Sequence, residues 1–385
     1  MPEAPLKPAP LLTTKQVATI PELTLACGER LREVTVGFET YGRLNEARDN
    51  AVLICHFFSG HSHAAGRYAP DDQELGWWDA VIGPGKAIDT ERYFVVSIDA
   101  LGCVRTDAPH GVTTSAASID PATGEPYGPA FPALAMADAV AAQRHVLTQL
   151  GVERLAAVAG PSLGAMQALE WAVSRPGEVD RVIASIGLAE FQPREIGLYR
   201  VMMDAIRLDP RFKDGRYDRA DPPIEGLAAS IKLMLLLSSG REALHESFGR
   251  AFADAECDPR LDRSAEWQVE AWLETEGRRR AALCDANAWI AMLRANMRWD
   301  LAHRYGSLAQ AFARLKARVL LIPGEGDELA HLPSYHLPMV QALEEAGADY
   351  AVAPLPPKRG HLAGLSDIGL AADAIRACLE TPLRA

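Results

Sequence analysis

The chain has 385 residues, of which 48% are hydrophobic and 23% charged, and it carries a formal net charge of -12. This composition supplies a large buried core, and the length fits one α/β core that carries an insertion. The negative charge disfavours nucleic acid and anionic lipid as partners, because their phosphate groups repel an acidic protein. The densest basic run, Arg278-Arg279-Arg280, is short and is interpreted as a solvated helix face.

The cysteines and the apolar runs indicate the cellular compartment in which the protein is expected. The six cysteines are scattered without CxxC pairs, which indicates neither a zinc site nor a disulfide framework. No apolar run approaches the length that spans a membrane. We therefore expect a cytoplasmic protein without a membrane partner.

The first half of the chain alternates short β-rich runs with helical patterns. Residues 23–41 predict an antiparallel pair of strands, and helical periodicity covers residues 133–150. Buried parallel strands are predicted over residues 51–56, 94–98, 155–159 and 181–186. Strand, helix and strand in this rhythm predict an α/β fold with a mostly parallel, doubly wound sheet.

The β signal then disappears between about residue 190 and residue 305. Amphipathic helices are predicted there over residues 195–208, 226–239, 241–255, 264–277 and 286–305. Strands return at residues 318–322 and 350–353, with helices over 338–346 and 367–379. A helical insertion that interrupts one sheet is expected to cover the edge of the sheet as a lid. The predicted parts are a first core part (residues 1–189), a helical lid (190–305) and a second core part (306–385).

Ser162 is the first candidate for chemistry, in the sequence Gly160-Pro161-Ser162-Leu163-Gly164. A serine hydroxyl is a weak nucleophile at neutral pH unless a base lies beside it. The GxSxG pattern between a strand and a helix forms a tight turn that presents the hydroxyl, and its glycines let the backbone pass closely. A buried turn serine that caps a helix is the alternative. The preceding strand and the following helix favour the nucleophile.

The partners of Ser162 are expected C-terminal to it, because an α/β-hydrolase places the acid and then the histidine after the serine. Asp327 directly follows the strand at residues 318–322, and we predict that it is the acid. His361 follows the last strand and precedes the final helix, and we predict that it is the base. The competing candidates are Glu325 and Glu328 for the acid, and His303, His331 and His336 for the base.

An acyl-transfer site also needs donors for the developing oxyanion. We predict that two backbone N–H groups are these donors. One belongs to Leu163, directly after the serine, and the other to Phe58, in the loop after the strand at residues 51–56. His61 and His63 lie close together in the sequence, but no third ligand follows at a spacing typical of metal sites. We therefore expect neither a metal nor an organic cofactor.

Several further stretches carry a family pattern: Glu39-Thr40-Tyr41-Gly42, Leu53-Ile54-Cys55-His56, Gly76-Trp77-Trp78-Asp79, Gly83-Pro84-Gly85-Lys86, Asp120-Pro121-Ala122-Thr123-Gly124, Gln167-Ala168-Leu169-Glu170-Trp171 and Asp285-Ala286-Asn287. With these, the chain resembles the homoserine O-acetyltransferase family, an α/β-hydrolase branch with a helical lid, over nearly its whole length. The resemblance places the family's catalytic serine, aspartate and histidine on Ser162, Asp327 and His361. It also implies a homodimer formed through the lid.

Two positions depart from the pattern of the family that the chain resembles. In that family an aspartate that holds the substrate amine follows the histidine, and here this place is Leu362. An arginine of the first lid helix, which binds the substrate carboxylate, falls on Met203. A buried charge without a partner carries a large desolvation penalty, so both changes disfavour homoserine as the acceptor. The residues that can take over substrate binding are Arg194, Tyr199 and Arg200.

These observations favour a carboxylesterase that hydrolyses small or short-chain esters through an acyl-serine intermediate. The alternative is an O-acyltransferase that moves an acetyl or other acyl group from acyl-CoA to homoserine or to another hydroxyl. The expected partner is a small-molecule ester or acyl donor in both cases. A third hypothesis, a non-catalytic scaffold that binds a small ligand, is disfavoured because all three triad residues are present.

Overall fold

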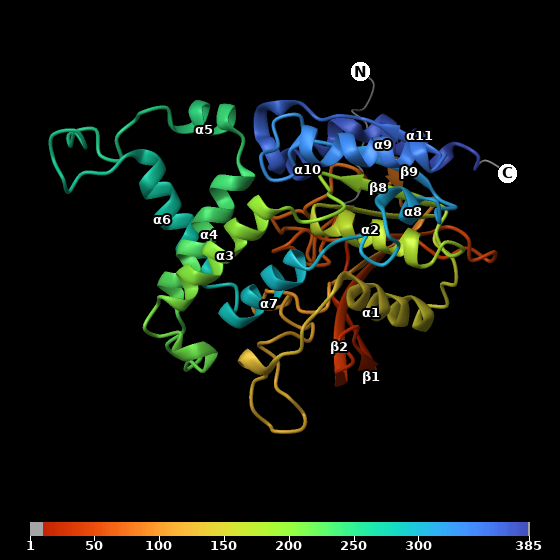
Figure 1. Cartoon of the computed structure of the whole chain (residues 1–385), viewed down its shortest axis with the longest axis horizontal. Coiled ribbons are helices and arrows are strands. Elements are labelled where there is room, and N and C mark those ends of the chain that lie inside the picture. Colours follow the sequence, from red (N-terminus) through yellow and green to blue (C-terminus); the bar gives the residue numbers. More distant parts are fainter. Residues whose placement is uncertain (1–10, 384–385) are drawn as a thin grey trace, which may run out of the picture.

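The structure is a computed structural model that describes residues 11–383. Its main sheet has the strand order β1-β2-β6-β3-β7-β8-β9-β10 (Figure 1). β1 and β2 pair antiparallel, as do β2 and β6, and the remaining neighbours are parallel. The strands are β1 (Gln16–Thr24), β2 (Arg30–Tyr41), β3 (Ala51–Cys55), β6 (Phe94–Ile98), β7 (Ala157–Pro161), β8 (Arg181–Ser185), β9 (Arg318–Ile322) and β10 (Tyr350–Val352), with a separate small pair, β4 (Ile82–Gly83) and β5 (Ile88–Asp89). The predicted α/β-hydrolase fold class is confirmed.

Helices cover both faces of this sheet, which explains why its inner strands are mainly apolar. All five residues of β3 are buried. Leu53 packs into the core cluster that contains residues of α1 and α2, whereas Ile54 packs into the second cluster, which contains residues of α11. Successive side chains of a strand point to opposite faces, so a strand between two helical layers must be apolar at every position. These helices are α1 (Met136–Gln149), α2 (Leu163–Ser174) and α11 (Ala372–Glu380), and the second core part adds α8 (Leu308–Phe312), α9 (Leu337–Glu345) and α10 (Ala363–Ser366).

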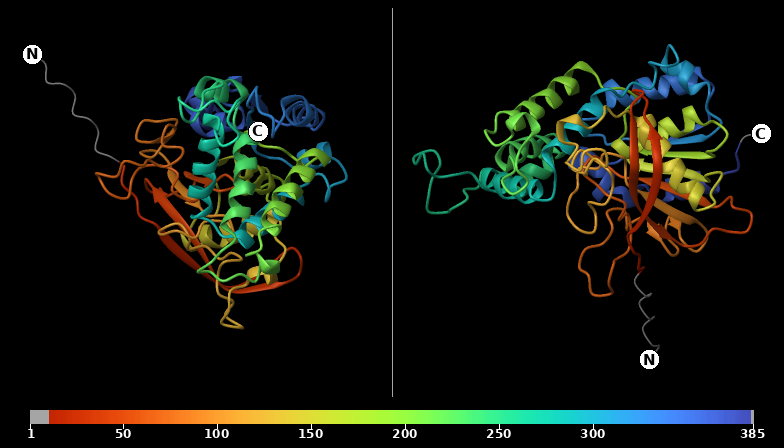
Figure 2. Two further views of the ribbon diagram at one scale, coloured as in Figure 1. Left: turned by 90° about the vertical axis from the view of Figure 1, so that its left-hand side faces the viewer. Right: turned by 90° about the horizontal axis from the view of Figure 1, so that it is seen from below.

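The segment predicted to form the lid, residues 190–305, lies wholly within the described residues and contains five α-helices. They are α3 (Pro193–Arg207), α4 (Ile224–Ser238), α5 (Arg241–Phe248), α6 (Gln268–Ala281) and α7 (Ala286–Met297). They gather on one side of the sheet, where α3 packs on α4 and α7, and α4 packs on α6 (Figures 1 and 2). The division into a core and a lid stays a prediction, and residues 1–10 and 384–385 of that division lie outside the described residues.

Some element boundaries differ from those expected. The antiparallel pair begins at Gln16 rather than at residue 23. Pro21 interrupts the pairing at one position only, and β1 continues past it because an edge strand tolerates a proline. α5 ends at Phe248 instead of residue 255, because Gly249 has a φ of 52° that no helix continues. α7 ends at Met297 rather than residue 305. Between residues 11 and 383 no helix is both long and apolar enough to cross a membrane.

Candidate active site

Ser162 lies on a strained turn between β7 and α2. Its φ of 54° and ψ of -116° are rare for a residue with a side chain, so the surrounding structure must hold them in place. The N–H of Ser162 donates to the carbonyl oxygen of Ser185 on β8, 2.9 Å away. A Cβ on Gly160 or Gly164 would lie closer than 3.0 Å to the carbonyl oxygen of Cys55. The two glycines therefore let β7 and α2 pass β3 closely enough to form the turn.

Ser162, His361 and Asp327 form one chain of hydrogen bonds. His361 Nε2 lies 2.9 Å from Ser162 Oγ, and His361 Nδ1 lies 2.6 Å from Asp327 Oδ2. The residues come from three places, the end of β7, the loop after β9 and the short 3-10 turn Pro357–Leu362 after β10. All three follow parallel strands, so they meet at the carboxyl edge of the sheet. With the proton on Nδ1, Nε2 can accept the serine proton.

The surroundings of Asp327 keep it charged. Its side chain is buried, and its Oδ1 accepts hydrogen bonds of 2.8 Å from the N–H groups of Leu329 and Ala330. Burial raises the pKa of a carboxyl group, but the charge and hydrogen bond of His361 together with the two N–H groups outweigh it. They hold the pKa of Asp327 below its ordinary value. A charged Asp327 fixes the orientation and the tautomer of His361.

The competing acids and histidines lie elsewhere. None of Glu325, Glu328, His303, His331 and His336 is hydrogen-bonded to Ser162 or His361 in the part of the chain that the structure describes. Glu328 pairs with an arginine of α5, and His331 lies against Ser334. His336 is buried, and within residues 11–383 neither of its ring nitrogens has a hydrogen-bond partner. Burial lowers its pKa to about 4.

Both predicted oxyanion donors are free to donate. Within the described residues, no hydrogen bond engages the backbone N–H of Phe58 or of Leu163. The N–H of Leu163 is free because this residue begins α2, where the first N–H groups have no partner within the helix. The Phe58 ring packs edge-on against Trp289 and Tyr199, with centroids 4.8 Å and 6.4 Å away. These contacts with the lid fix the loop that carries the Phe58 N–H.

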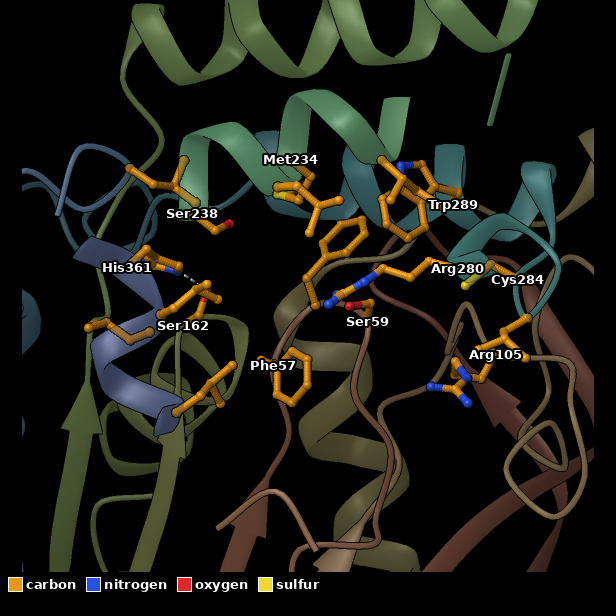
Figure 3. A pocket seen from close by; sticks show the side chains of 18 of the residues that line it. Phe57, Ser59, Arg105, Ser162, Met234, Ser238, Arg280, Cys284, Trp289 and His361 are labelled. Carbon is orange, nitrogen blue, oxygen red and sulfur yellow. Dashed lines mark hydrogen bonds between the residues drawn. The ribbon is translucent and has the colours of Figure 1, made fainter. Parts of the chain in front are cut away.

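A cavity of about 320 Å³ lies over Ser162 and His361 (Figure 3). Apolar side chains of α4, among them Met234, form part of its wall, and Leu362 and Leu365 lie on the side of His361. No aspartate or glutamate is among the described residues that line it. The uncharged polar side chains of the lining are Ser59, Ser162, Tyr199 and Ser238.

The structure brings only part of the predicted substrate-binding set to this cavity. Leu362 and Tyr199 line it. Met203 is fully buried in the core and does not reach the cavity, because it lies one helical turn beyond Tyr199 on the same face of α3. Arg200 is exposed and ion-paired with Asp204, 2.8 Å away, and it does not line the cavity either. Met203 and Arg200, two of the candidates for the substrate pocket, therefore lie outside this cavity.

Two arginines of the lid were missed as site residues. The run Arg278-Arg279-Arg280 is exposed along its length, as interpreted, but Arg279 and Arg280 also line the cavity. Arg105, in the loop after β6, lines it as well. The basic run was the signal in the sequence. Which of its side chains face the cavity depends on how α6 packs against α4.

The neighbouring histidines have structural contacts. The ring of His61 stacks on that of His110 with centroids 3.6 Å apart, and His63 Nδ1 lies 3.0 Å from Glu39 Oε2. Residues 11–383 contain no group of three or more histidine, cysteine, aspartate or glutamate side chains that could hold a metal ion. All six cysteines are free thiols.

The chain is similar to known proteins over almost its full length. Residues 50–242 match a family model described as alpha/beta hydrolase fold. A homoserine O-acetyltransferase of Symbiobacterium thermophilum is 40% identical over 381 residues, which are 97% of each chain. The crystal structure of homoserine O-acetyltransferase from Bacillus anthracis superposes with a TM-score of 0.92 at 35% identity and covers 97% of this chain and 99% of that one. Esterase E22 superposes with a TM-score of 0.90 at 37% identity and covers 96% of this chain and 100% of that one. A leucine-to-aspartate mutant of it has the same TM-score at 36% identity.

Proposed function

Because this chain belongs to the homoserine O-acetyltransferase family of α/β-hydrolases, we propose that it is a serine-dependent O-acyltransferase. The observation that carries the proposal is the hydrogen-bonded chain of Ser162, His361 and Asp327 beneath the cavity. The similarity to an acetyltransferase over 97% of the chain supports this function better than the carboxylesterase that the sequence interpretation placed first.

In the first half of the reaction, Ser162 takes the acyl group. His361 Nε2 accepts the proton of Ser162 Oγ while the oxygen attacks the acyl carbonyl of the donor. The N–H groups of Phe58 and Leu163 stabilise the resulting oxyanion, and Asp327 stabilises the imidazolium. When the bond between the carbonyl carbon and the leaving group breaks, His361 returns the proton to the leaving thiolate or alkoxide. The product of this half is an acyl ester on Ser162.

In the second half, an acceptor hydroxyl replaces the leaving group. His361 takes the proton of the acceptor, the acceptor oxygen attacks the acyl-Ser162 ester, and the proton passes back to Ser162 Oγ as that ester breaks. The same steps with water as the acceptor are hydrolysis. The choice between transfer and hydrolysis therefore depends on which acceptor the cavity holds next to His361.

The residues that line the cavity limit which acceptor molecules it can bind. Leu362 lies beside His361, and the described lining contains no carboxylate. A substrate ammonium brought into this cavity would lose its hydration without gaining a counter-charge, which is unfavourable. We therefore propose that the acceptor hydroxyl belongs to a molecule without an ammonium group near the triad.

A carboxylesterase is the second candidate function, and the apolar Leu362 is the observation that favours it. Without groups that hold an alcohol, water is the default acceptor. The similarity to esterase E22 at 37% identity is consistent with this. One assay distinguishes the two functions. It uses acetyl-CoA or an aryl acetate as the donor and measures both the new ester and the free acetate, with and without a series of hydroxyl acceptors. An acyltransferase forms new ester in proportion to the acceptor, whereas an esterase releases only acetate.

We also propose that the chain forms a homodimer through the lid, in the cytoplasm. Val201, Leu208 and Leu261 of the lid segment are apolar and between 55% and 88% exposed. Large apolar side chains that a folded chain leaves exposed can be covered in a protein interface. Sedimentation equilibrium tests this, and a monomer at micromolar concentration would contradict it.

A further inference from the structure

The wall of the cavity is cationic on the side away from Leu362. Arg105, Arg279 and Arg280 are the arginines of its described lining, which contains no lysine. In Figure 3, Ser162 and His361 lie at one end of the cavity, and Arg280, Cys284 and Arg105 lie toward the other. The cavity therefore has a reactive end with apolar walls and a second end with positive charge.

Two of these arginines each form a two-pronged pair with a carboxylate. Arg105 donates through Nε and Nη2 to the two oxygens of Asp107, at 2.6 Å and 2.7 Å. Arg279 donates in the same two-pronged way to Glu276, at 3.0 Å and 2.9 Å. This arrangement satisfies the planar fork of a guanidinium and largely neutralises it.

Arg280 is different. Its Nε makes one long hydrogen bond of 3.2 Å to Glu276 Oε2, an oxygen that already accepts from Arg279. Within residues 11–383 its two terminal nitrogens have no hydrogen-bond partner. Figure 3 shows its side chain extending into the cavity on the side of Ser59. Hydrogen bonds thus join three guanidinium groups to two carboxylates, and among the described residues Arg280 is the arginine of this set for which both terminal nitrogens lack a partner.

We propose that Arg280 binds an anionic group of the substrate, such as a carboxylate or a phosphate, while the acyl carbon lies at Ser162. Free Nη donors at the wall of a partly closed cavity suit such a group, because charge-assisted hydrogen bonds from a guanidinium fork are strong and directional. The inference rests on the proposed function, since it assigns a substrate class to the same cavity. The anionic group can come from the acyl chain, the acceptor or the acyl donor.

The experiment compares matched neutral and anionic compounds for each source. For the acyl chain these are p-nitrophenyl butyrate and mono-p-nitrophenyl succinate, and for the acceptor they are propanol and 3-hydroxypropanoate. For the donor they are S-acetylpantetheine and acetyl-CoA. The variants are Arg280→Gln and Arg280→Lys, with Arg278→Gln as the matched control, because Arg278 pairs with Glu225 and Glu274 and does not line the cavity.

The expected result is that Arg280→Gln lowers the anionic-to-neutral ratio of kcat/KM at least about tenfold in one of the three pairs. That pair identifies the source of the charge. Arg280→Lys keeps part of the ratio, and Arg278→Gln keeps all of it. A ratio that Arg280→Gln leaves unchanged in every pair would overturn the anion site.

Binding to Ser162→Ala protein, measured by calorimetry with the same compounds, tests the site without turnover. The anion site predicts weaker binding of one anionic compound when Arg280→Gln is added, and equal binding contradicts it. Failure of the wild-type protein to turn over any neutral ester or thioester contradicts the proposed function instead. The two failures are therefore distinguishable.

Discussion

Gly164 at the start of α2 lies against Cys55 at the end of β3, so close that a Cβ on the glycine would lie within 3.0 Å of the Cys55 carbonyl oxygen. The sheet thus sets the position of the turn that carries Ser162. This contact and the hydrogen bond to Ser185 hold the backbone of Ser162 at its strained φ.

We predict that Gly164→Ala destabilises the protein by about 1–3 kcal/mol, because the added methyl group must displace backbone rather than a flexible side chain. Acyl transfer should fall with it, since any shift moves Ser162 Oγ relative to His361. Chemical denaturation with parallel esterase assays measures both effects. Gly177→Ala is the matched control, because a Cβ there meets nothing within 4 Å. Equal stability of the two variants would show that the close contact does not constrain the turn.

We predict that Asp327→Asn lowers kcat by roughly four orders of magnitude with little change in fold, as is seen for triads of this geometry. The amide donates where the carboxylate accepted, so His361 takes the tautomer that cannot accept the serine proton. Pre-steady-state kinetics with an aryl acetate, with circular dichroism as the fold control, measures the change. A loss of less than tenfold would assign the acid role elsewhere, and Glu328→Gln provides the comparison.

The buried His336 predicts a pH dependence of stability. Burial lowers its folded-state pKa to about 4 from an ordinary value of 6.5. Between pH 4 and pH 6.5 this histidine is therefore mostly protonated in the unfolded chain and mostly neutral in the folded chain. Stability contributed by this group is therefore complete above pH 6.5 and falls by about 3 kcal/mol as the pH drops to 4. His336→Leu should flatten this part of the unfolding curve, while the control His245→Gln, on α5, should not. An equal slope in wild type and His336→Leu would contradict the prediction.

Leu362 provides a test of acceptor choice. We predict that Leu362→Asp raises the ratio of transfer to homoserine over hydrolysis by about tenfold or more, because the new carboxylate beside His361 gives the substrate ammonium a partner. Leu362→Asn is the control, since it has the same shape without the charge. The measurement is the partition of acetyl-CoA between O-acetylhomoserine and acetate. If both variants change the ratio equally, charge at this position does not select the acceptor.

Much of the fold could be predicted from the sequence, because its signals are local. The parallel strands are mainly apolar runs, and a helix separates most of them. The turn around Ser162 has its own pattern, and the order of strands places Asp327 and His361 near it by topology. The exact extents could not be predicted where one residue decides them, as at Pro21 in β1 and Gly249 after α5.

The lining of the cavity was the part that sequence could not predict. Tyr199 and Met203 share a face of α3, but only the packing of α3 on α4 and α7 decides that Tyr199 reaches the cavity and Met203 the core. Likewise, Arg278, Arg279 and Arg280 follow one another in the sequence, yet they point in different directions around α6. Which of them faces the cavity depends on tertiary contacts and not on the basic run.

The central claim is that Ser162 carries the acyl group. Rapid quenching of the protein with an acetyl donor in acid, followed by peptide mass spectrometry, tests it most directly. The account predicts one acetyl group on the peptide that contains Ser162, its absence in Ser162→Ala, and its release when an acceptor is added before quenching. An unmodified Ser162 peptide during steady turnover, or wild-type turnover by Ser162→Ala, would contradict it.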